Sequence, residues 1–185
     1  MGILAKIWAF LVDSVQTLLL AAAVFLVIYI FLFRPFQVNG HSMDPNYQDG
    51  EYILTNLVVL HFKMPQLGDV VVFTAPKEPD KDFIKRVIGM AGDQIMLKSG
   101  SVYRNGTLLN ENKYLDPNVK TYGGSFLAEG AQVTVPEDSY FVLGDNRPNS
   151  SDSREWGFVK KDLLIGESFF VYWPPNKMEL IRNPY

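Results

Sequence analysis

The sequence has no cysteine, and its only two histidines, His41 and His61, lie far apart. Without thiols the chain can form neither a disulfide framework nor a thiolate zinc site, and it has no cysteine nucleophile. Two separated histidines without a second ligand nearby do not make the spacing of a metal site, so we expect none. A lack of cysteine suits an oxidising, extracytoplasmic location.

An excess of positive charge is also missing. The 185 residues carry 17 basic and 20 acidic side chains, for a formal net charge of −3. This balance lacks the one-sided positive field that is typical of nucleic-acid-binding proteins, so we expect no nucleic-acid partner. The length leaves room for one domain with an appendage and for a substantial core.

A long apolar run near the amino terminus is the first positive feature, because residues 15–33 contain no charge. As a helix at ~1.5 Å per residue they would span ~28 Å, close to the ~30 Å hydrocarbon core of a bilayer. A cleaved signal has a shorter core and a small-x-small exit, whereas this run leaves through Arg34-Pro35. A buried globular helix would need a large protein around it. We predict a retained transmembrane anchor over 15–33, after a short segment 1–14, with its orientation left open by the flanking charges.

Residues 34–185 are predicted to form a mainly β domain, a folded and partly closed antiparallel sheet system behind the one transmembrane helix. β-Branched and aromatic runs bounded by Gly, Pro, Asn or Asp indicate short strands. Asn105-Gly106 is the pair favoured in two-residue hairpin turns. Residues 106–131 are polar and turn-rich, which favours an excursion or flap outside the core. The predicted strands are 51–60, 69–74, 82–88, 93–98, 101–105, 132–135, 140–143 and 163–173.

A candidate nucleophile, Ser42, lies in the turn-like segment 40–45 (GHSMDP). A serine needs a base within hydrogen-bond reach to become nucleophilic. Gly40 allows a tight turn and close approach of a substrate carbonyl. The segment alone is weak evidence, since a serine in a turn is more often a hydrogen-bonding turn residue.

A candidate base, Lys85, lies in the predicted strand 82–88. Strand alternation places Lys85 and Arg86 on opposite faces, so one cation must point where apolar side chains point. A lysine packed among apolar groups has a lowered pKa and can accept the serine proton. Alternatively its stem packs and its head reaches water. His41 is a poor base for Ser42 because neighbouring side chains diverge, and His61 has no supporting context.

A third segment, residues 144–154 (GDNRPNSSDSR), follows a predicted apolar strand and is dense in hydrogen-bonding side chains. It is interpreted either as a solvated loop of good turn formers or as a polar scaffold that orients the lysine. The local pattern does not separate these alternatives.

Together, these three segments behind an apolar run resemble bacterial type I signal peptidases, and the match is close to the short, single-anchor form of Gram-positive bacteria. The resemblance covers nearly the whole chain, including residues 68–73 and 85–89. It implies a membrane-bound Ser/Lys dyad endopeptidase that removes amino-terminal signal peptides from exported preproteins through an acyl-enzyme. It also implies a cytoplasmic amino terminus, an extracytoplasmic catalytic domain near the membrane surface, and no metal or cofactor.

The resemblance assigns roles by position. Ser42 is the nucleophile, Lys85 is the general base and later the acid, and Ser150 hydrogen-bonds the lysine. Gly40 replaces a serine that in some relatives helps form the oxyanion hole, so the hole would rest on backbone N–H groups, that of Ser42 first. Asn46 replaces the usual threonine, and lysine rather than histidine at 85 argues against the endoplasmic-reticulum type. The surrounding scaffold consists of Asp145, Asp152, Arg154 and Arg86.

The expected partners are secretory preproteins, with small side chains at the first and third residues before the cut, and membrane lipid. An extended preprotein could add as a β-strand beside residues 82–85. Two alternatives are a self-cleaving repressor-type Ser/Lys protease, whose relatives are soluble and DNA-binding, and a membrane-tethered inactive scaffold with a peptidase fold. The residues expected to wall the substrate pockets are Phe36, Val38, Met43, Phe83 and Ile84.

Overall fold

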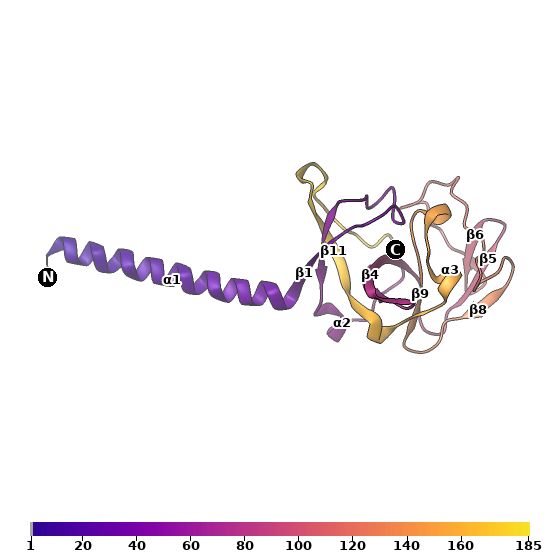
Figure 1. Cartoon of the computed structure of the whole chain (residues 1–185), viewed down its shortest axis with the longest axis horizontal. Helices are drawn as coiled ribbons and strands as arrows, with labels where there is room; N and C mark the ends of the chain where they lie inside the picture. The colour runs from indigo at the N-terminus through magenta and orange to yellow at the C-terminus, as the bar shows by residue number, and fades with distance from the viewer. Residues whose placement is uncertain (1) are drawn as a thin grey trace.

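The computed structural model describes residues 2–185. One helix, α1 (Ile3–Leu32), extends away from a β-rich domain formed by the rest of the chain (Figure 1). Among the described residues it is the one helix long and apolar enough to cross a membrane, over Ile3–Tyr29. The helix thus begins well before the expected anchor start at residue 15 and ends one residue before its expected end. Phe33 already belongs to the first strand.

Two antiparallel sheets make up the domain. The larger has the order β1-β2-β11-β3-β4-β9-β10, with β12 paired to β11, and the smaller has the order β7-β6-β5-β8. Besides α1, two short helices, α2 (Val59–Phe62) and α3 (Ser153–Trp156), and three 3-10 turns, η1 (Arg147–Asn149), η2 (Lys161–Leu163) and η3 (Pro175–Lys177), join these strands. The strands are β1 (Phe33–Gln37), β2 (Tyr52–Asn56), β3 (Val70–Ala75), β4 (Glu78–Gly89), β5 (Gln94–Lys98), β6 (Ser101–Arg104), β7 (Thr107–Leu108), β8 (Gln132–Thr134), β9 (Ser139–Leu143), β10 (Val159–Lys160), β11 (Leu164–Trp173) and β12 (Glu179–Leu180).

The prediction of a mainly β, antiparallel domain behind one apolar helix is confirmed. Asn105 and Gly106 join β6 to β7 with φ of 53° and 77°, the positive values that a type I′ turn requires. The predicted strand 51–60 is too long, because β2 covers only Tyr52–Asn56. The side-chain Oδ1 of Asn56 accepts the backbone N–H groups of Val58 and Val59, 3.0 Å from each, which starts α2 instead.

The central strands are covered on both faces, which explains why they are apolar without alternation. In β3, Val70 and Val72 pack with Ile53 in one core cluster, whereas Val71 and Phe73 pack in another. Successive strand side chains point to opposite faces, so a fully apolar strand needs packing partners on both sides. This double coverage gives the domain rigid strands on which to hold polar groups.

The excursion between β7 and β8 is tied to the body of the domain. It has no helix or strand between residues 109 and 131, as expected for a turn-rich segment. However, Leu127 is fully buried in a core cluster, and Leu115 is also buried. The backbone N–H groups of Phe126 and Leu127 donate to the Arg154 carbonyl at 2.8 and 3.1 Å. The prediction that this segment lies outside the core is therefore wrong for its buried leucines.

Candidate active site

Ser42 lies on the turn that follows β1, where local sequence determines the backbone. Gly40 has a φ of +91°, a left-handed conformation that favours glycine, and its N–H donates to Asp49 Oδ1 at 2.6 Å. Ser42 itself is half-buried. The residue after it, Met43, is completely buried in a core cluster that also contains Val38. The two apolar side chains thus anchor the turn on either side of the serine.

Lys85 reaches Ser42 from β4, and its Nζ lies 2.7 Å from Ser42 Oγ. The same nitrogen donates to the Ile84 carbonyl at 2.9 Å. Lys85 is only 4% exposed, and this burial lowers its pKa to about 8, against the opposing effect of the negative charges on Asp152 and Asp145. A neutral amine in hydrogen-bond contact with a hydroxyl can take up its proton.

Arg86 is buried as completely as Lys85, so both adjacent cations lie in the interior and not merely the one that strand alternation requires there. Its guanidinium forms a bidentate pair with Asp145, with Nε–Oδ1 and Nη2–Oδ2 distances of 2.8 and 2.6 Å. It also donates to the Gly68 carbonyl and stacks 4.3 Å from the Tyr114 ring centre. Full pairing is what allows a second cation into the interior.

The polar loop, residues 144–154, is an ordered network and not a solvated turn. Asp152 accepts two bonds from the Arg154 guanidinium, each at 2.8 Å, and one from the Gly144 backbone N–H at 3.1 Å. Arg147 is fully buried and pairs with Glu111 of the excursion. The expected scaffold residues therefore form two separate ion pairs, Arg86–Asp145 and Arg154–Asp152, which sequence alone did not assign.

Ser150 does not make the hydrogen bond to Lys85 that the resemblance implies. Its Oγ is buried and has no hydrogen-bond partner among the residues that the structure describes. The hydroxyl instead lies beside Gly144, where an added Cβ would be 2.2 Å from Ser150 Oγ and 2.4 Å from the Ser42 carbonyl oxygen. Only glycine at 144 allows the polar loop and the serine turn to approach this closely.

Ser42 and Lys85 open onto a cavity of about 240 Å³, here called the Ser42 cleft. Phe36, Phe83 and Ile84 line it, as expected from sequence. Val38 and Met43 do not line it; they are buried in a core cluster, 2% and 0% exposed. The other lining residues, which the local sequence does not mark as pocket residues, are Gln37, Asn39, Ile53, Val72, Asp82 and Ser151.

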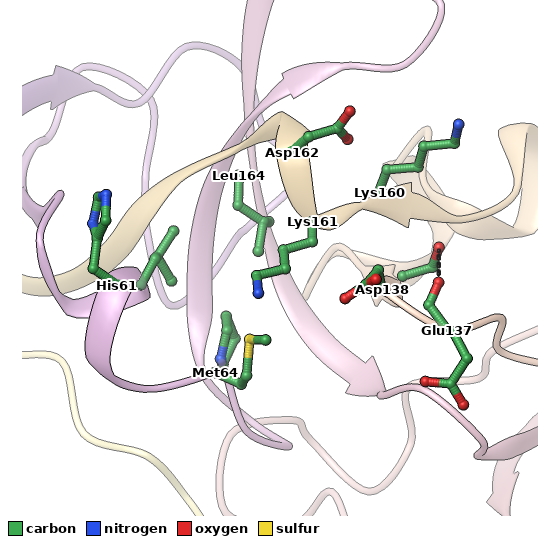
Figure 2. Close-up of a pocket in the computed structure, with 11 residues that line it drawn as sticks. His61, Met64, Glu137, Asp138, Lys160, Lys161, Asp162 and Leu164 are labelled. Atoms are coloured by element: carbon green, nitrogen blue, oxygen red, sulfur yellow. Dashed lines mark hydrogen bonds between the residues drawn. The ribbon is translucent and has the colours of Figure 1, made fainter.

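A larger cavity, about 880 Å³, lies elsewhere and contains none of the predicted site residues. Figure 2 shows His61 on one side of it and Glu137 and Lys160 on the other. Its one serine, Ser139, donates its hydroxyl to the Glu137 carbonyl at 3.3 Å and makes no hydrogen bond with a basic side chain among the described residues. Size alone would favour this cavity, but it lacks a nucleophile paired with a base. The described residues also include no cluster of three or more His, Asp or Glu that could hold a metal ion.

Comparison with known proteins adds independent information. The family model described as "Signal peptidase, peptidase S26" matches residues 11–173. "Signal peptidase IB" of Staphylococcus aureus (strain MRSA252) is 33% identical over 186 residues, covering 93% of this chain and 96% of that protein. "Probable signal peptidase I-2" of Synechocystis sp. (strain PCC 6803) is 34% identical over 173 residues, covering 91% and 76%. A crystal structure of a signal peptidase I from Enterococcus faecalis V583 aligns with a TM-score of 0.46 at 32% identity, covering 57% of this chain and 97% of that one.

Proposed function

The chain belongs to the S26 family of signal peptidases and is a serine peptidase, and we propose that it removes amino-terminal signal peptides from exported preproteins with a Ser42/Lys85 dyad. The observation that carries the proposal is the 2.7 Å contact between Lys85 Nζ and Ser42 Oγ beside a cleft. Burial of the lysine supplies the neutral amine that the chemistry needs.

In the proposed mechanism, neutral Lys85 accepts the Ser42 proton as Oγ attacks the scissile carbonyl. The developing oxyanion accepts a hydrogen bond from the Ser42 backbone N–H, which makes no hydrogen bond within residues 2–185. The Lys85 ammonium then donates its proton to the leaving amine, and an acyl-enzyme remains. Lys85 next takes a proton from water, which attacks the ester carbonyl. As the ester bond breaks, the Lys85 ammonium returns that proton to Ser42 Oγ, which releases the signal peptide and restores neutral Lys85.

We assign the two buried ion pairs a positioning role. Arg86–Asp145 ties the polar loop to β4, whereas Arg154–Asp152 braces the loop internally. Asp145 also accepts a hydrogen bond from Asn46 Nδ2 at 2.8 Å, so one carboxylate links the strand of the base to the segment of the nucleophile. Ser150 belongs to this orienting set because its buried Oγ lies where the loop and the serine turn meet.

The Ser42 cleft supports a preference for small side chains before the cut. Phe36, Phe83 and Ile84 give it apolar walls, and its volume of about 240 Å³ limits the side chains that fit. One edge of β4 is also open next to the lysine. β9 pairs with β4 only over Arg86–Gly89, so within the described residues nothing pairs with residues 82–85 on that side. An extended preprotein can add there as a strand.

We further propose that α1 anchors the protein in the cell membrane, with the amino terminus cytoplasmic and residues 33–185 outside. The apolar side chains of α1 are exposed, and insertion into a membrane would remove their unfavourable contact with water. β1 follows α1 directly, and its five residues span roughly 17 Å at ~3.3 Å each. Because Phe36 and Gln37 near its end line the Ser42 cleft, the scissile bond would be held close to the membrane surface.

The test is cleavage of a preprotein in detergent or lipid by wild type, Ser42→Ala and Lys85→Ala. Lys81→Ala is the matched control, since Lys81 is an exposed lysine on the same strand that pairs with Glu78. We expect cutting after a small-x-small sequence by wild type and the control, and at least a 10³-fold loss in both dyad variants, because alone neither group can act.

Each other outcome has a definite meaning. Activity that survives Lys85→Ala would place the base elsewhere. A folded wild-type protein that cuts none of several preproteins would refute the proposed removal of signal peptides and favour the alternative of a membrane-tethered scaffold.

A further inference from the structure

Asn146 of the polar loop holds the peptide bond that precedes the nucleophile. Its side-chain Nδ2 donates to the His41 carbonyl at 2.8 Å, and its backbone N–H donates to the Ser42 carbonyl at 3.0 Å. Its Oδ1 accepts a hydrogen bond from Asn149 Nδ2 at 3.3 Å, so in this orientation both the amide nitrogen and the amide oxygen of Asn146 have a hydrogen-bond partner. One residue therefore binds two consecutive carbonyls of the serine turn, 105 positions away in the sequence.

The geometry of the peptide unit gives this contact a consequence for Ser42. A trans peptide is planar, with its C=O and N–H pointing in opposite directions. When Asn146 holds the His41 carbonyl on its own side, the Ser42 N–H must point away from the polar loop. Among the described residues no hydrogen bond uses this N–H. Gly40 offers no hydroxyl that could share the task.

We propose that Asn146 is a positioning residue for the oxyanion hole: through the His41 carbonyl it orients the Ser42 N–H. The same carbonyl also accepts the Asp44 backbone N–H, but at 3.3 Å, so the 2.8 Å bond from Asn146 is the shorter of the two. The inference rests on the proposed function, because it presumes that Ser42 forms a tetrahedral intermediate. Asn146 touches neither Ser42 Oγ nor Lys85, so it acts only through the backbone. A donor that is oriented before the reaction stabilises the oxyanion without a reorganisation cost. The catalytic effect of an oxyanion hole comes from this preorganisation.

Asn146→Ala tests this directly, because it removes Nδ2 and keeps the backbone N–H that binds the Ser42 carbonyl. We expect kcat to fall roughly 10- to 100-fold with KM nearly unchanged, since outright loss of one oxyanion donor costs about 10²–10³-fold. A second readout uses a peptide aldehyde that matches the residues before the cut. Ser42 Oγ adds to its carbonyl, and the resulting tetrahedral oxygen takes the place of the oxyanion. Affinity for the aldehyde should fall by the same factor as kcat, and affinity for the matching peptide amide should not change.

Two further variants complete the experiment. Asn118→Ala removes an exposed asparagine whose side chain, within the described part of the chain, bonds only to Asp116, and it should match wild type. Asn146→Asp keeps the shape but places a carboxylate oxygen against the His41 carbonyl, so it should lose at least as much kcat as the alanine variant. If Asn146→Ala fails to fold, the kcat of Asn146→Asp tests the positioning role in its place.

Three results would overturn the inference. The first is a kcat close to wild type in both Asn146 variants. The second is an equal loss of aldehyde and amide affinity, which would mean that Asn146 affects substrate binding in general. The third is failure of both variants to fold, because a residue that only orients one donor is not needed for folding. A wild-type protein that cuts no preprotein would instead refute the proposed function, so the two failures are distinguishable.

Discussion

Replacing Gly144 by alanine should disable the enzyme through a single added methyl group. Gly144 follows β9 at the point where the polar loop meets the serine turn. A Cβ there would lie 2.4 Å from the Ser42 carbonyl oxygen, and 2.2 and 2.6 Å from Ser150 Oγ and Cβ. Real Cβ atoms essentially never approach other heavy atoms closer than 3.0 Å, so these groups must move.

The size of the movement follows from these distances. The Ser42 carbonyl must shift by about 0.6 Å or more, and it is backbone held by the Asn146 N–H, so it cannot rotate away as a side chain would. Such a shift would disturb the 2.7 Å contact between Ser42 Oγ and Lys85 Nζ. A misplacement of ~1 Å can cost about 10²-fold in rate, so we expect kcat/KM to fall roughly 30- to 100-fold. Overpacking should also cost about 1–3 kcal/mol of unfolding free energy.

The assay is preprotein cleavage in detergent, at a temperature where each variant is folded by circular dichroism. Gly89→Ala is the control, because its Cβ would meet Ile95 side-chain atoms at 2.9 and 3.0 Å and Val135 at 3.2 Å. Both residues belong to a different core cluster from Met43, the neighbour of Ser42. It should lose stability to a similar extent but keep kcat/KM near the wild-type value. A Gly144→Ala enzyme with wild-type activity, or equal losses in the two variants, would refute the proposed link between this contact and catalysis.

Two further predictions concern pH and specificity. Because the neutral amine is the active form and burial lowers the Lys85 pKa to about 8, kcat/KM should rise with pH through that value and fall about tenfold per unit below it. A profile that is flat between pH 6 and 9 would contradict the role of Lys85. Alanine at Phe36 or Ile84 removes a wall of the Ser42 cleft and should raise cleavage of preproteins with larger residues before the cut by about tenfold or more, measured on a panel of such substrates. Val38→Ala, buried beneath the cleft, should change stability and not selection; unchanged selection in the two cleft variants would refute the pocket assignment.

Some features follow from the sequence because neighbouring residues determine them. A charge-free run predicts a long apolar helix, alternating or continuous β-branched runs predict strands, and Asn105-Gly106 predicts a hairpin turn. Their physical basis is local, since backbone propensity, side-chain period and turn conformation depend on a few adjacent positions. The candidate nucleophile and base also came from local segments, although their order in the chain mattered as much as their composition.

Other features depend on which strands become neighbours, and no local pattern contains them. Arg86 forms hydrogen bonds with Asp145, 59 positions away in the sequence, and Asn146 donates one to the His41 carbonyl, 105 positions away. Alternation within β4 suggested that one of its two adjacent cations would face an apolar environment, but packing on both faces buries both. The same packing moves Val38 and Met43 from the expected pocket wall into the core. The sequence by itself determined the elements and the chemistry they carry, whereas the tertiary structure decided their partners, because burial and pairing arise only when distant strands close around the same site.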